Sequence, residues 1–300
     1  NAGDVPQPRC APSTGKKIAV IGGGPGGLSA AYYLVLMGHH VAIYEKRQKL
    51  GGMMRYGIPS YRFPREKLDA EIESILSLGI EVHTGVKVGN EISFEELKAN
   101  YDCLYISIGA HTDKKVGIEG EDSIGVISAV EMLGKIGDDE MPDFTGQNVV
   151  VVGGGNTALT DALTLSKLCR EVHVVHRRDA FRGDKIYVDA LVKRENVTVH
   201  WNSRVTAIHG ETALEGVTVE DIPSGMQRRL PCEGLFVCVG RTPNSQLVRG
   251  LIPMDEADYL LARDTETPIP GVFAAGDIRK KPLRQVITAA ADGAVAAHLA

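Results

Sequence analysis

A run of glycines between a strand pattern and a helix pattern constrains this 300-residue chain more than any other feature. The apolar segment 17–21 leads into Gly22-Gly23-Gly24-Pro25-Gly26-Gly27, and a helical pattern follows from Leu28 to Met37. Glycine permits the tight turn and the close backbone approach that a phosphate requires at a helix N-terminus. The segment 41–44 predicts a second strand, which ends at Glu45. These elements predict a βαβ unit that binds a nucleotide.

The same order of elements returns in the second half of the chain. A strand pattern at 148–152 leads into Gly153-Gly154-Gly155-Asn156-Thr157-Ala158, then into a helix through Leu168 and a strand at 171–175. Two such units predict an α/β fold with two Rossmann-like dinucleotide-binding domains.

The two units differ at the residue expected to contact the ribose. Glu45 lies 23 residues after Gly22, where a carboxylate can accept hydrogen bonds from ribose hydroxyls. The residue at the same distance from Gly153 is His176. Three arginines follow this histidine: Arg177, Arg178 and Arg182. Because a 2′-phosphate is repelled by a carboxylate and held by arginine, we expect the second unit to prefer NADP(H), although a solvated basic turn is the alternative.

Three further segments end in small residues, as sheet strands do where they meet a cofactor. Residues 103–108 precede Gly109, and residues 235–239 precede Gly240. Residues 271–275 lead to Gly276 and Asp277, ahead of an alanine-rich helix predicted over 285–297. The carboxylate of Asp277 can hydrogen-bond a polyol, or it can simply cap the turn.

Longer motifs carry a family resemblance over nearly the whole chain. The first half is similar to the NADPH-dependent small subunit of glutamate synthase, through residues 11–17 and Gly51-Gly52-Met53-Met54-Arg55-Tyr56-Gly57-Ile58-Pro59. The second half resembles thioredoxin reductase, through residues 176–182, 271–277 and 281–285. Together the motifs resemble the flavoproteins of the pyridine nucleotide-disulfide oxidoreductase superfamily.

The resemblance implies that the two glycine loops hold different cofactors. FAD would be bound by Gly22, Gly24, Gly27, Glu45, Gly52, Arg55, Gly109, Gly276, Asp277 and Gln285. NADPH would be bound by Gly153, Gly155, Asn156, Thr157, Ala158, His176, Arg177, Arg178, Arg182 and Gly240. In this assignment Asp277 holds the ribityl chain and the arginines hold the 2′-phosphate. For Arg55 and Tyr56 a packing role is the alternative, and no catalytic side chain or metal is assigned because the flavin carries the chemistry.

The two halves of the predicted FAD site are 255 residues apart, from Gly22 to Asp277, yet both must contact one cofactor. The NADPH domain is therefore expected to be inserted within the FAD domain. We expect a flexible linker at 1–15, the FAD domain at 16–112 and 243–300, and the NADPH domain at 113–242.

The cysteines restrict the route by which electrons can leave. There are five, without a C-x-x-C pair: Cys10, Cys103, Cys169, Cys232 and Cys238. Thioredoxin reductases place a redox C-x-x-C shortly before the second glycine loop, whereas residues 124–137 contain no cysteine. Without two thiols to exchange, thioredoxin reduction is expected to be absent. The cysteines in strand patterns, Cys103, Cys232 and Cys238, are expected to be packing residues.

The resemblance therefore implies an FAD-dependent oxidoreductase that passes electrons between NADPH and an iron-sulfur protein, domain or subunit. Cys10 alone cannot hold a cluster, so the chain is expected to be part of a larger polypeptide or complex. One alternative is a thioredoxin-reductase-like ferredoxin–NADP reductase, and another is a non-catalytic FAD-binding structural or sensing subunit.

Composition argues against two classes of partner. The chain has 33 basic and 38 acidic residues, a net charge of −5, which disfavours general attraction to nucleic acid or anionic lipid. Its longest apolar run, residues 30–37, is far shorter than the roughly 18 residues of a membrane span.

His173 and His176 fall on opposite faces of a predicted strand, which disfavours a shared metal. With no signal peptide pattern and no disulfide framework, we expect a cytoplasmic protein.

Overall fold

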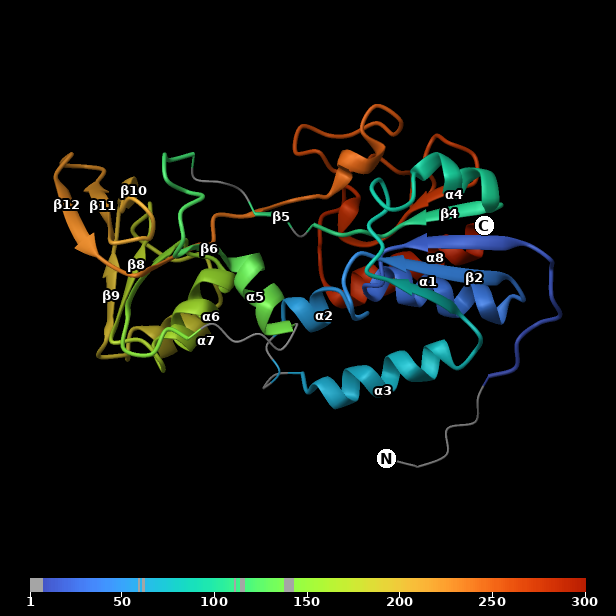
Figure 1. Ribbon diagram of the computed structural model, residues 1–300, viewed down its shortest axis with the longest axis horizontal. Helices are drawn as coiled ribbons and strands as arrows, with labels where there is room; N and C mark the ends of the chain where they lie inside the picture. The colour runs from blue at the N-terminus through green and yellow to red at the C-terminus, as the bar shows by residue number, and fades with distance from the viewer. Residues whose placement is uncertain (1–7, 59, 61–62, 111, 114–116, 138–142) are drawn as a thin grey trace. The chain divides into compact units, whose positions relative to one another are not determined.

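The computed structural model describes residues 8–58, 60, 63–110, 112–113, 117–137 and 143–300 (Figure 1). The chain divides into two compact units, here called the first unit (residues 1–112 and 242–300) and the second unit (residues 113–241). The second unit is thus inserted in the sequence of the first. The chain passes between the units at β5 (Thr112–Asp113) and β14 (Arg241–Thr242), two short strands that pair with each other.

A five-stranded sheet of order β15-β4-β1-β2-β3 forms the centre of the first unit, and all of its neighbouring strands are parallel. Its strands are β1 (Lys17–Ile21), β2 (His40–Glu45), β3 (Glu81–Thr84), β4 (Cys103–Ile106) and β15 (Val272–Ala274). The unit's helices are α1 (Pro25–Leu36), α2 (Met53–Tyr56), α3 (Arg65–Leu76), α4 (Phe94–Asn100) and α8 (Val286–Leu299), with 3₁₀ turns η1 (Ser245–Val248) and η2 (Gly276–Ile278).

The first strand is apolar on both faces because helices or loops cover both sides of a parallel sheet. In β1, the residues Ile18 to Ile21 are all buried. Small residues allow α1 and α8, which lie side by side, to approach closely (Figure 1). A Cβ at Gly293 of α8 would lie 2.2 Å from the Gly26 carbonyl oxygen, and Ser29 Oγ donates to the Ala290 carbonyl oxygen at 2.7 Å.

The described part of the expected N-terminal linker is bound to the first unit. The amide of Ala11 donates to the Leu36 carbonyl oxygen at 2.8 Å, and the amide of Thr14 donates to the Gly38 carbonyl oxygen at 2.9 Å. Gly38 has φ of 87°, and a Cβ there would lie 2.2 Å from the Pro12 carbonyl oxygen. The turn after α1 thus supplies carbonyl acceptors for two amides of the expected linker, those of Ala11 and Thr14; residues 1–7 lie outside the described ranges.

The second unit contains a second parallel five-stranded sheet, of order β6-β13-β7-β8-β9. Its strands are β6 (Val126–Ser128), β7 (Asn148–Val152), β8 (Glu171–Val175), β9 (Val197–His200) and β13 (Gly234–Val237). The helices are α5 (Ala129–Gly137), α6 (Asn156–Leu165) and α7 (Lys185–Leu191). The predicted α/β class with two Rossmann-like units is thereby confirmed. Helix α6 ends before the expected Leu168, because the chain turns at residues 166–168.

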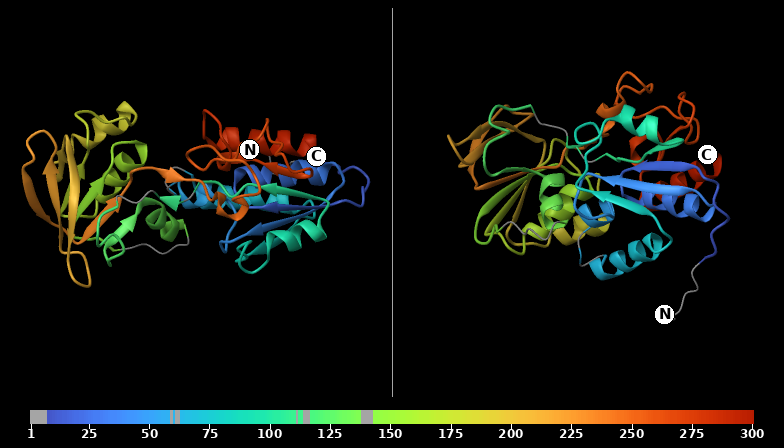
Figure 2. Two further views of the ribbon diagram at one scale, coloured as in Figure 1. Left: turned by 90° about the horizontal axis from the view of Figure 1, so that it is seen from above. Right: turned by 45° about the vertical axis from the view of Figure 1, so that its right-hand side comes forward.

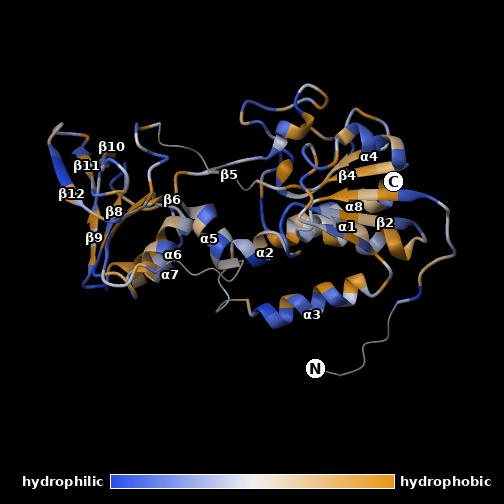
Figure 3. Ribbon diagram, in the orientation of Figure 1, coloured by the Kyte–Doolittle hydropathy of each residue, from blue (hydrophilic) through white to orange (hydrophobic). Residues whose placement is uncertain are grey.

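An antiparallel sheet of order β10-β11-β12 completes the second unit and was not expected from the sequence. Its strands are β10 (Ser203–His209), β11 (Gly216–Asp221) and β12 (Gln227–Pro231), and it lies beside the parallel sheet of its own unit (Figure 2). Val205, Val217 and Val219 pack into one apolar cluster with valines of β7. The edge strand β12 is mostly exposed and hydrophilic (Figure 3).

Membrane crossing requires a long apolar helix, and none is found in the part of the chain that the structure describes.

Candidate functional site

The first glycine loop joins β1 to α1, and most of its glycines are required by the turn itself. Gly22 has φ of 104°, and a Cβ there would lie 2.4 Å from the Ser107 carbonyl oxygen. A Cβ at Gly27 would lie 1.9 Å from the Gly22 carbonyl oxygen. Gly24 is different, since the nearest atom to its missing Cβ is the Gly52 Cα at 3.7 Å. The loop therefore leaves space at Gly24, where a pyrophosphate would approach the backbone.

The helix that follows this loop has a free N-terminus, in the sense that no side chain among the described residues caps it. Gly24 is the N-cap residue of α1 and provides no side-chain hydrogen bond, while Pro25 occupies the first position of the helix. Such an end carries partial positive charge and attracts an anion. The first unit thus has both the space and the polarity that a phosphate group requires.

Glu45 ends β2 beside the glycine loop and is 8% exposed. One of its carboxylate oxygens accepts a hydrogen bond from the Gly23 amide at 2.8 Å, and the other accepts one from the Arg47 amide at 2.9 Å. These bonds hold the carboxylate in a fixed orientation, with lone pairs left for further donors.

The structure brings the two distant halves of the predicted FAD site together. β1, β4 and β15 are parallel neighbours, so their carboxyl ends meet at one edge of the sheet, where open α/β sheets bind ligands. A Cβ at Gly26 would lie 3.5 Å from the Gly276 Cα and 2.7 Å from Ser107 Oγ. The turn that carries Asp277 therefore lies against the start of α1, 250 residues away in sequence from Gly26 to Gly276.

Asp277 has one buried oxygen without a hydrogen-bond partner among the described residues. This atom, Oδ1, lies 3.6 Å from Lys281 Nζ, beyond hydrogen-bond distance. A buried acceptor without a donor costs free energy, so the position suits a ligand that brings a hydroxyl group. The orphaned oxygen fits the ribityl role implied by the sequence resemblance.

A buried charged cluster lies next to this turn, and its centre is Asp292 of α8, a residue that was not predicted from the sequence. The Asp292 carboxylate accepts hydrogen bonds from the Gly276 amide at 3.0 Å, from Arg279 Nε at 2.8 Å and from Lys281 Nζ at 3.0 Å. Burial alone would raise the pKa of Asp292, but the hydrogen bonds from Arg279 and Lys281 outweigh it and hold the pKa below its usual range. The available signal was a single acid within an alanine-rich helix.

Other residues assigned to FAD take different positions in the first unit. Gly52 lies beside the glycine loop, because a Cβ there would be 2.6 Å from the Gly24 Cα. Arg55 is 4% exposed; its Nε donates to the Leu50 carbonyl oxygen at 2.7 Å, and its Nη2 pairs with Asp69. These contacts match the packing alternative for Arg55.

The neighbouring Tyr56 is 2% exposed and donates from its hydroxyl to the Lys49 carbonyl oxygen at 3.1 Å. Gly109 has φ of 65° and accepts a backbone hydrogen bond from the Asn244 amide at 3.2 Å. Gln285 is exposed at the start of α8.

The second glycine loop joins β7 to α6 with the same division of roles. Gly153 has φ of 148°, and a Cβ there would lie 2.6 Å from the Cys238 carbonyl oxygen. Gly155, the N-cap residue of α6, has no atom within 4 Å of its missing Cβ and provides no side-chain cap. Ala158 is fully buried, while Asn156 is exposed and Thr157 is partly exposed. The open position again coincides with a free helix N-terminus.

The basic turn that follows β8 is tied to this second loop at both ends. His176 is 5% exposed, and its ring occupies the space beside Gly154, where a Cβ would lie 2.3 Å from it. At the other end, the Arg182 amide donates to the Gly154 carbonyl oxygen at 2.8 Å. Asn156 and Asp184 add two hydrogen bonds, at 2.7 and 2.9 Å. Sequence reasoning missed this Asn156–Asp184 pair, because the two residues are 28 positions apart.

The side chains of the three arginines in this turn are exposed: Arg177, Arg178 and Arg182. Burial lowers the pKa of His176 and the arginines lower it further, against a hydrogen bond with the Ala180 carbonyl oxygen. The imidazole is therefore neutral at neutral pH and serves to pack the turn against Gly154. Gly240, three residues after the end of β13, is exposed and has φ of 125°.

His173 points to a different set of partners from His176. His173 Nδ1 lies 3.1 Å from His200 Nε2, and the other His200 nitrogen contacts Arg228 of β12. Burial and the Arg228 charge lower the pKa of His200 to about 4. Within the described ranges, no group of three His, Cys, Asp or Glu side chains is arranged to hold a metal ion.

All five cysteines are free thiols, and the structure describes every one of them. Cys232 is fully buried, which confirms its packing role, while Cys103 and Cys238 are partly buried. Burial raises the pKa of both Cys103 and Cys232 to about 12, so neither is a ready nucleophile.

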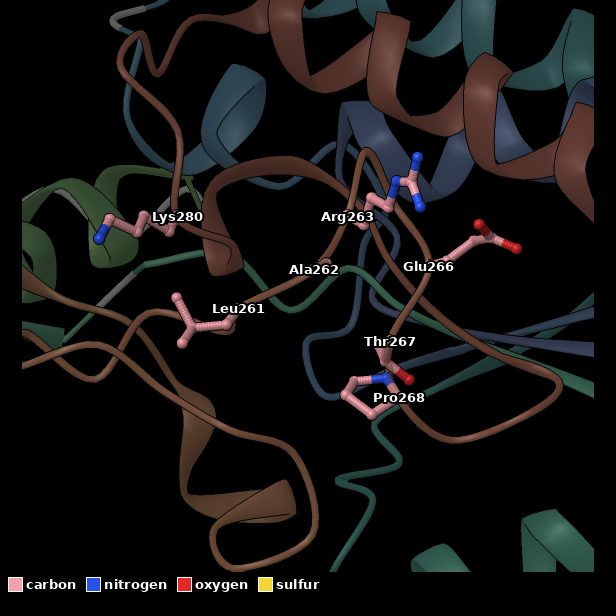
Figure 4. Close-up of a pocket in the computed structure, with 7 residues that line it drawn as sticks. All are labelled: Leu261, Ala262, Arg263, Glu266, Thr267, Pro268 and Lys280. Atoms are coloured by element: carbon pink, nitrogen blue, oxygen red, sulfur yellow. The ribbon is translucent and has the colours of Figure 1, made fainter.

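A surface hollow lies elsewhere on the first unit (Figure 4). It is lined by Leu261, Ala262, Arg263, Glu266, Thr267, Pro268 and Lys280. The charged side chains of Arg263, Glu266 and Lys280 extend in different directions and do not converge on one point (Figure 4). None of the residues assigned to FAD lines this hollow.

Comparison with known proteins gives matches over almost the full length of the chain. The pyridine nucleotide-disulphide oxidoreductase family matches residues 16–293. The NADP(+)-dependent formate dehydrogenase subunit beta of Moorella thermoacetica is 34% identical over 94% of this chain, which spans 43% of that subunit. The thioredoxin reductase of Treponema pallidum is 32% identical, with 94% of this chain and 95% of that protein aligned. Among solved structures, Lactococcus lactis thioredoxin reductase superimposes with a TM-score of 0.78 at 28% identity, covering 95% of this chain and 97% of that one.

Proposed function

Because this chain belongs to the pyridine nucleotide-disulphide oxidoreductase family, we propose that it moves electrons between NADPH and a separate protein acceptor through a bound FAD. The chain is an oxidoreductase with FAD and NADP(H) as its cofactors. Which unit holds which cofactor, and where the electrons go, are the parts that we propose.

We assign FAD to the first unit. The open space at Gly24 and the free N-terminus of α1 suit the pyrophosphate, and the fixed carboxylate of Glu45 suits the ribose hydroxyls. The unpartnered Oδ1 of Asp277, which accepts no hydrogen bond from the described residues, suits the ribityl chain. In this assignment Arg55 supports the segment before Gly52 through its hydrogen bond to the Leu50 carbonyl oxygen and its ion pair with Asp69.

We assign NADPH to the second unit. The space at Gly155 and the free N-terminus of α6 suit its pyrophosphate. The exposed guanidinium groups of Arg177, Arg178 and Arg182 would hold the 2′-phosphate, and the packed ring of His176 fixes the turn that carries them. The first unit has Glu45 at the equivalent position, which disfavours a 2′-phosphate there.

Bound FAD accepts a hydride and can release its electrons one at a time, which suits an iron-sulfur acceptor. The residues of this chain bind and orient; no general acid or base is required of them for hydride transfer. Glu45 and Asp277 would accept hydrogen bonds from FAD, and each glycine loop would admit the phosphates of its cofactor to the backbone amides.

The observation that carries the proposal is that the sequence has two glycine loops, each expected to bind a dinucleotide, but no dithiol. No C-x-x-C occurs in the sequence, and the five cysteines are unpaired. This chain therefore offers electrons no thiol route to thioredoxin, and we infer that they leave the flavin for a separate acceptor.

An iron-sulfur domain or subunit is the acceptor that we favour. The 34% identical relative from Moorella thermoacetica is named as a subunit of an NADP(+)-dependent formate dehydrogenase, which supports a place in an electron-transfer assembly. The resemblance of residues 11–17 and 51–59 to the glutamate synthase small subunit supports the same type of role.

A stand-alone ferredoxin–NADP reductase is the second candidate. The observation that favours it is the similarity to thioredoxin reductase along 94% of this chain, at 32% identity to the Treponema pallidum protein, in a sequence that contains no C-x-x-C. Such an enzyme would work on a diffusing iron-sulfur protein and could run in either direction.

The test measures NADPH oxidation by the FAD-loaded chain with two acceptors, a ferredoxin and a thioredoxin, under anaerobic conditions. We expect the ferredoxin to be reduced and the thioredoxin to remain oxidised. Turnover with the free chain favours the stand-alone reductase, whereas turnover only when a cluster-bearing partner is attached favours the subunit role. Reduction of thioredoxin at a comparable rate would refute the proposed electron route.

A further inference from the structure

A buried ammonium group lies between two carboxylates next to the Asp277 turn. Lys281 Nζ is 3.0 Å from Asp292 Oδ2 and 3.6 Å from Asp277 Oδ1. The Lys281 side chain is 5% exposed and that of Asp292 is 9% exposed. In this low-polarity surrounding each charge requires a partner, so the position of the ammonium group depends on which carboxylate holds it more strongly.

Asp292 holds the cations of this turn by several contacts at once. Its carboxylate accepts two hydrogen bonds from Arg279, through Nε and Nη2, and one from Lys281. The Gly276 amide provides a fourth, which fixes the backbone directly before Asp277. The lowered pKa of Asp292 and the raised pKa of Arg279, both caused by hydrogen bonds between them, agree with a charged cluster at neutral pH.

Resting on the FAD assignment above, we propose that Asp292 is a positioning residue that holds Lys281 away from Asp277 and so keeps the Asp277 carboxylate free for the flavin's ribityl hydroxyls. Arg279 pairs with Asp292, and Lys281 Nζ lies closer to Asp292 Oδ2, at 3.0 Å, than to Asp277 Oδ1, at 3.6 Å. Asp277 Oδ1 is left buried and without a hydrogen bond from the described residues.

Loss of the Asp292 charge would let Lys281 pair with Asp277 instead. Without the Asp292 charge, Lys281 would have one carboxylate within reach, at 3.6 Å, and a small movement would close that ion pair. The ammonium group would then occupy the oxygen that the ribityl chain needs. A buried ion pair is costly to break, so FAD would have to compete with it.

The experiment measures the equilibrium affinity of the FAD-free protein for FAD by quenching of flavin fluorescence. Asp292→Asn is expected to weaken FAD binding about 10- to 100-fold, because Lys281 would then pair with the Asp277 carboxylate and displace the hydrogen bonds from the ribityl hydroxyls. Asp292→Asn combined with Lys281→Met is expected to recover most of that loss, since the competing ammonium group is gone. Asp292→Glu, which keeps the charge, is expected to bind more tightly than Asp292→Asn.

Asp102→Asn provides the matched control. Asp102 also accepts hydrogen bonds from a lysine, Lys16 Nζ at 2.9 Å, and from a backbone amide, that of Lys17 at 2.9 Å, but it precedes β4 at the opposite end of the sheet. We expect this variant to bind FAD as the wild type does. Circular dichroism melting of every variant separates loss of folding from loss of affinity.

Lys281→Met alone keeps the proposal testable if Asp292→Asn does not fold. Because Asp292 already holds Lys281 away from Asp277 in the wild type, Lys281→Met is expected to bind FAD at least as tightly as the wild type, and a tenfold loss would overturn the proposal. The proposal also fails if Asp292→Asn binds FAD as tightly as the wild type, or if the double variant is folded yet no better than Asp292→Asn. If the wild-type protein itself binds no FAD, the function proposed above fails together with this inference.

Discussion

Reversing the charge of Arg177 and Arg178 should remove the preference of the second unit for a 2′-phosphate. In the described parts of the chain these exposed guanidinium groups form no ion pair or hydrogen bond through their side chains, so both are free to hold a ligand. The turn that carries them is fixed by His176 and by the bond from the Arg182 amide to the Gly154 carbonyl oxygen. The double variant Arg177→Glu/Arg178→Glu should therefore keep its backbone conformation and change only the charge.

The size of the effect follows from the number of charged hydrogen bonds lost. Each bond between a guanidinium group and a phosphate contributes about 1.5 to 3 kcal/mol, and exposure to solvent favours the lower end of this range. Two such losses amount to about 3 kcal/mol, or a rise of about 100-fold in the Kd for NADP⁺. The Kd for NAD⁺, which has no 2′-phosphate, should change by less than about threefold.

Isothermal titration calorimetry with NADP⁺ and NAD⁺ measures both constants without turnover. Lys193→Glu/Arg194→Glu is the matched control, since it reverses two adjacent, exposed charges of the same unit outside the basic turn. We expect the control to leave both affinities nearly unchanged. An equal loss of NADP⁺ and NAD⁺ affinity in the Arg177/Arg178 variant would show that these residues do not recognise the phosphate.

The first glycine loop, His200 and the cysteines each give a further prediction. Gly24→Ala should leave the melting temperature nearly unchanged but weaken FAD binding. Gly27→Ala should lower the melting temperature, because its Cβ would lie 1.9 Å from the Gly22 carbonyl oxygen. Equal melting temperatures for the two variants would contradict the different roles of these glycines in the loop. In the folded protein His200 has a pKa of about 4, against an ordinary value of 6.5, and is neutral at neutral pH. As the pH falls, His200 is therefore protonated in the unfolded chain before it is protonated in the folded protein. The free energy of unfolding should thus keep its full value above pH 6.5 and decrease by about 3 kcal/mol as the pH is lowered to 4. In chemical denaturation, His200→Gln should show a weaker dependence of this free energy on pH between 6.5 and 4. Replacing all five cysteines by serine should leave the rate of flavin reduction by NADPH unchanged in stopped-flow measurements, since no dithiol takes part; loss of that rate in a folded variant would indicate a thiol step.

Much of the parallel architecture could be predicted because its signals are local. Strands β1, β7 and β8 begin and end at the residues expected from the apolar patterns at 17–21, 148–152 and 171–175. Glycines that the turns require, such as Gly22 and Gly153, mark the loops between strand and helix. The antiparallel sheet β10–β12 was missed, because β12 is mostly polar and its pairing with β11 is decided by contacts distant in sequence.

The candidate site also contains both residues that could be predicted from the sequence and residues that could not. Glu45 and the arginines of the basic turn stand at fixed distances from a glycine loop, so spacing was sufficient to find them. Asp292 and the Asn156–Asp184 pair have no such spacing, and their importance comes from what the fold places beside them. For Arg55 the sequence left binding and packing open, and the contacts with Leu50 and Asp69 favour packing.

The most direct test is an anaerobic titration of the FAD-loaded chain with NADPH, followed by the visible absorbance of the bound flavin. We predict that the chain retains FAD, and that about one equivalent of NADPH bleaches it while NADH reacts far more weakly. A chain that takes up no flavin, or a bound flavin that stays oxidised under excess NADPH, would contradict the account.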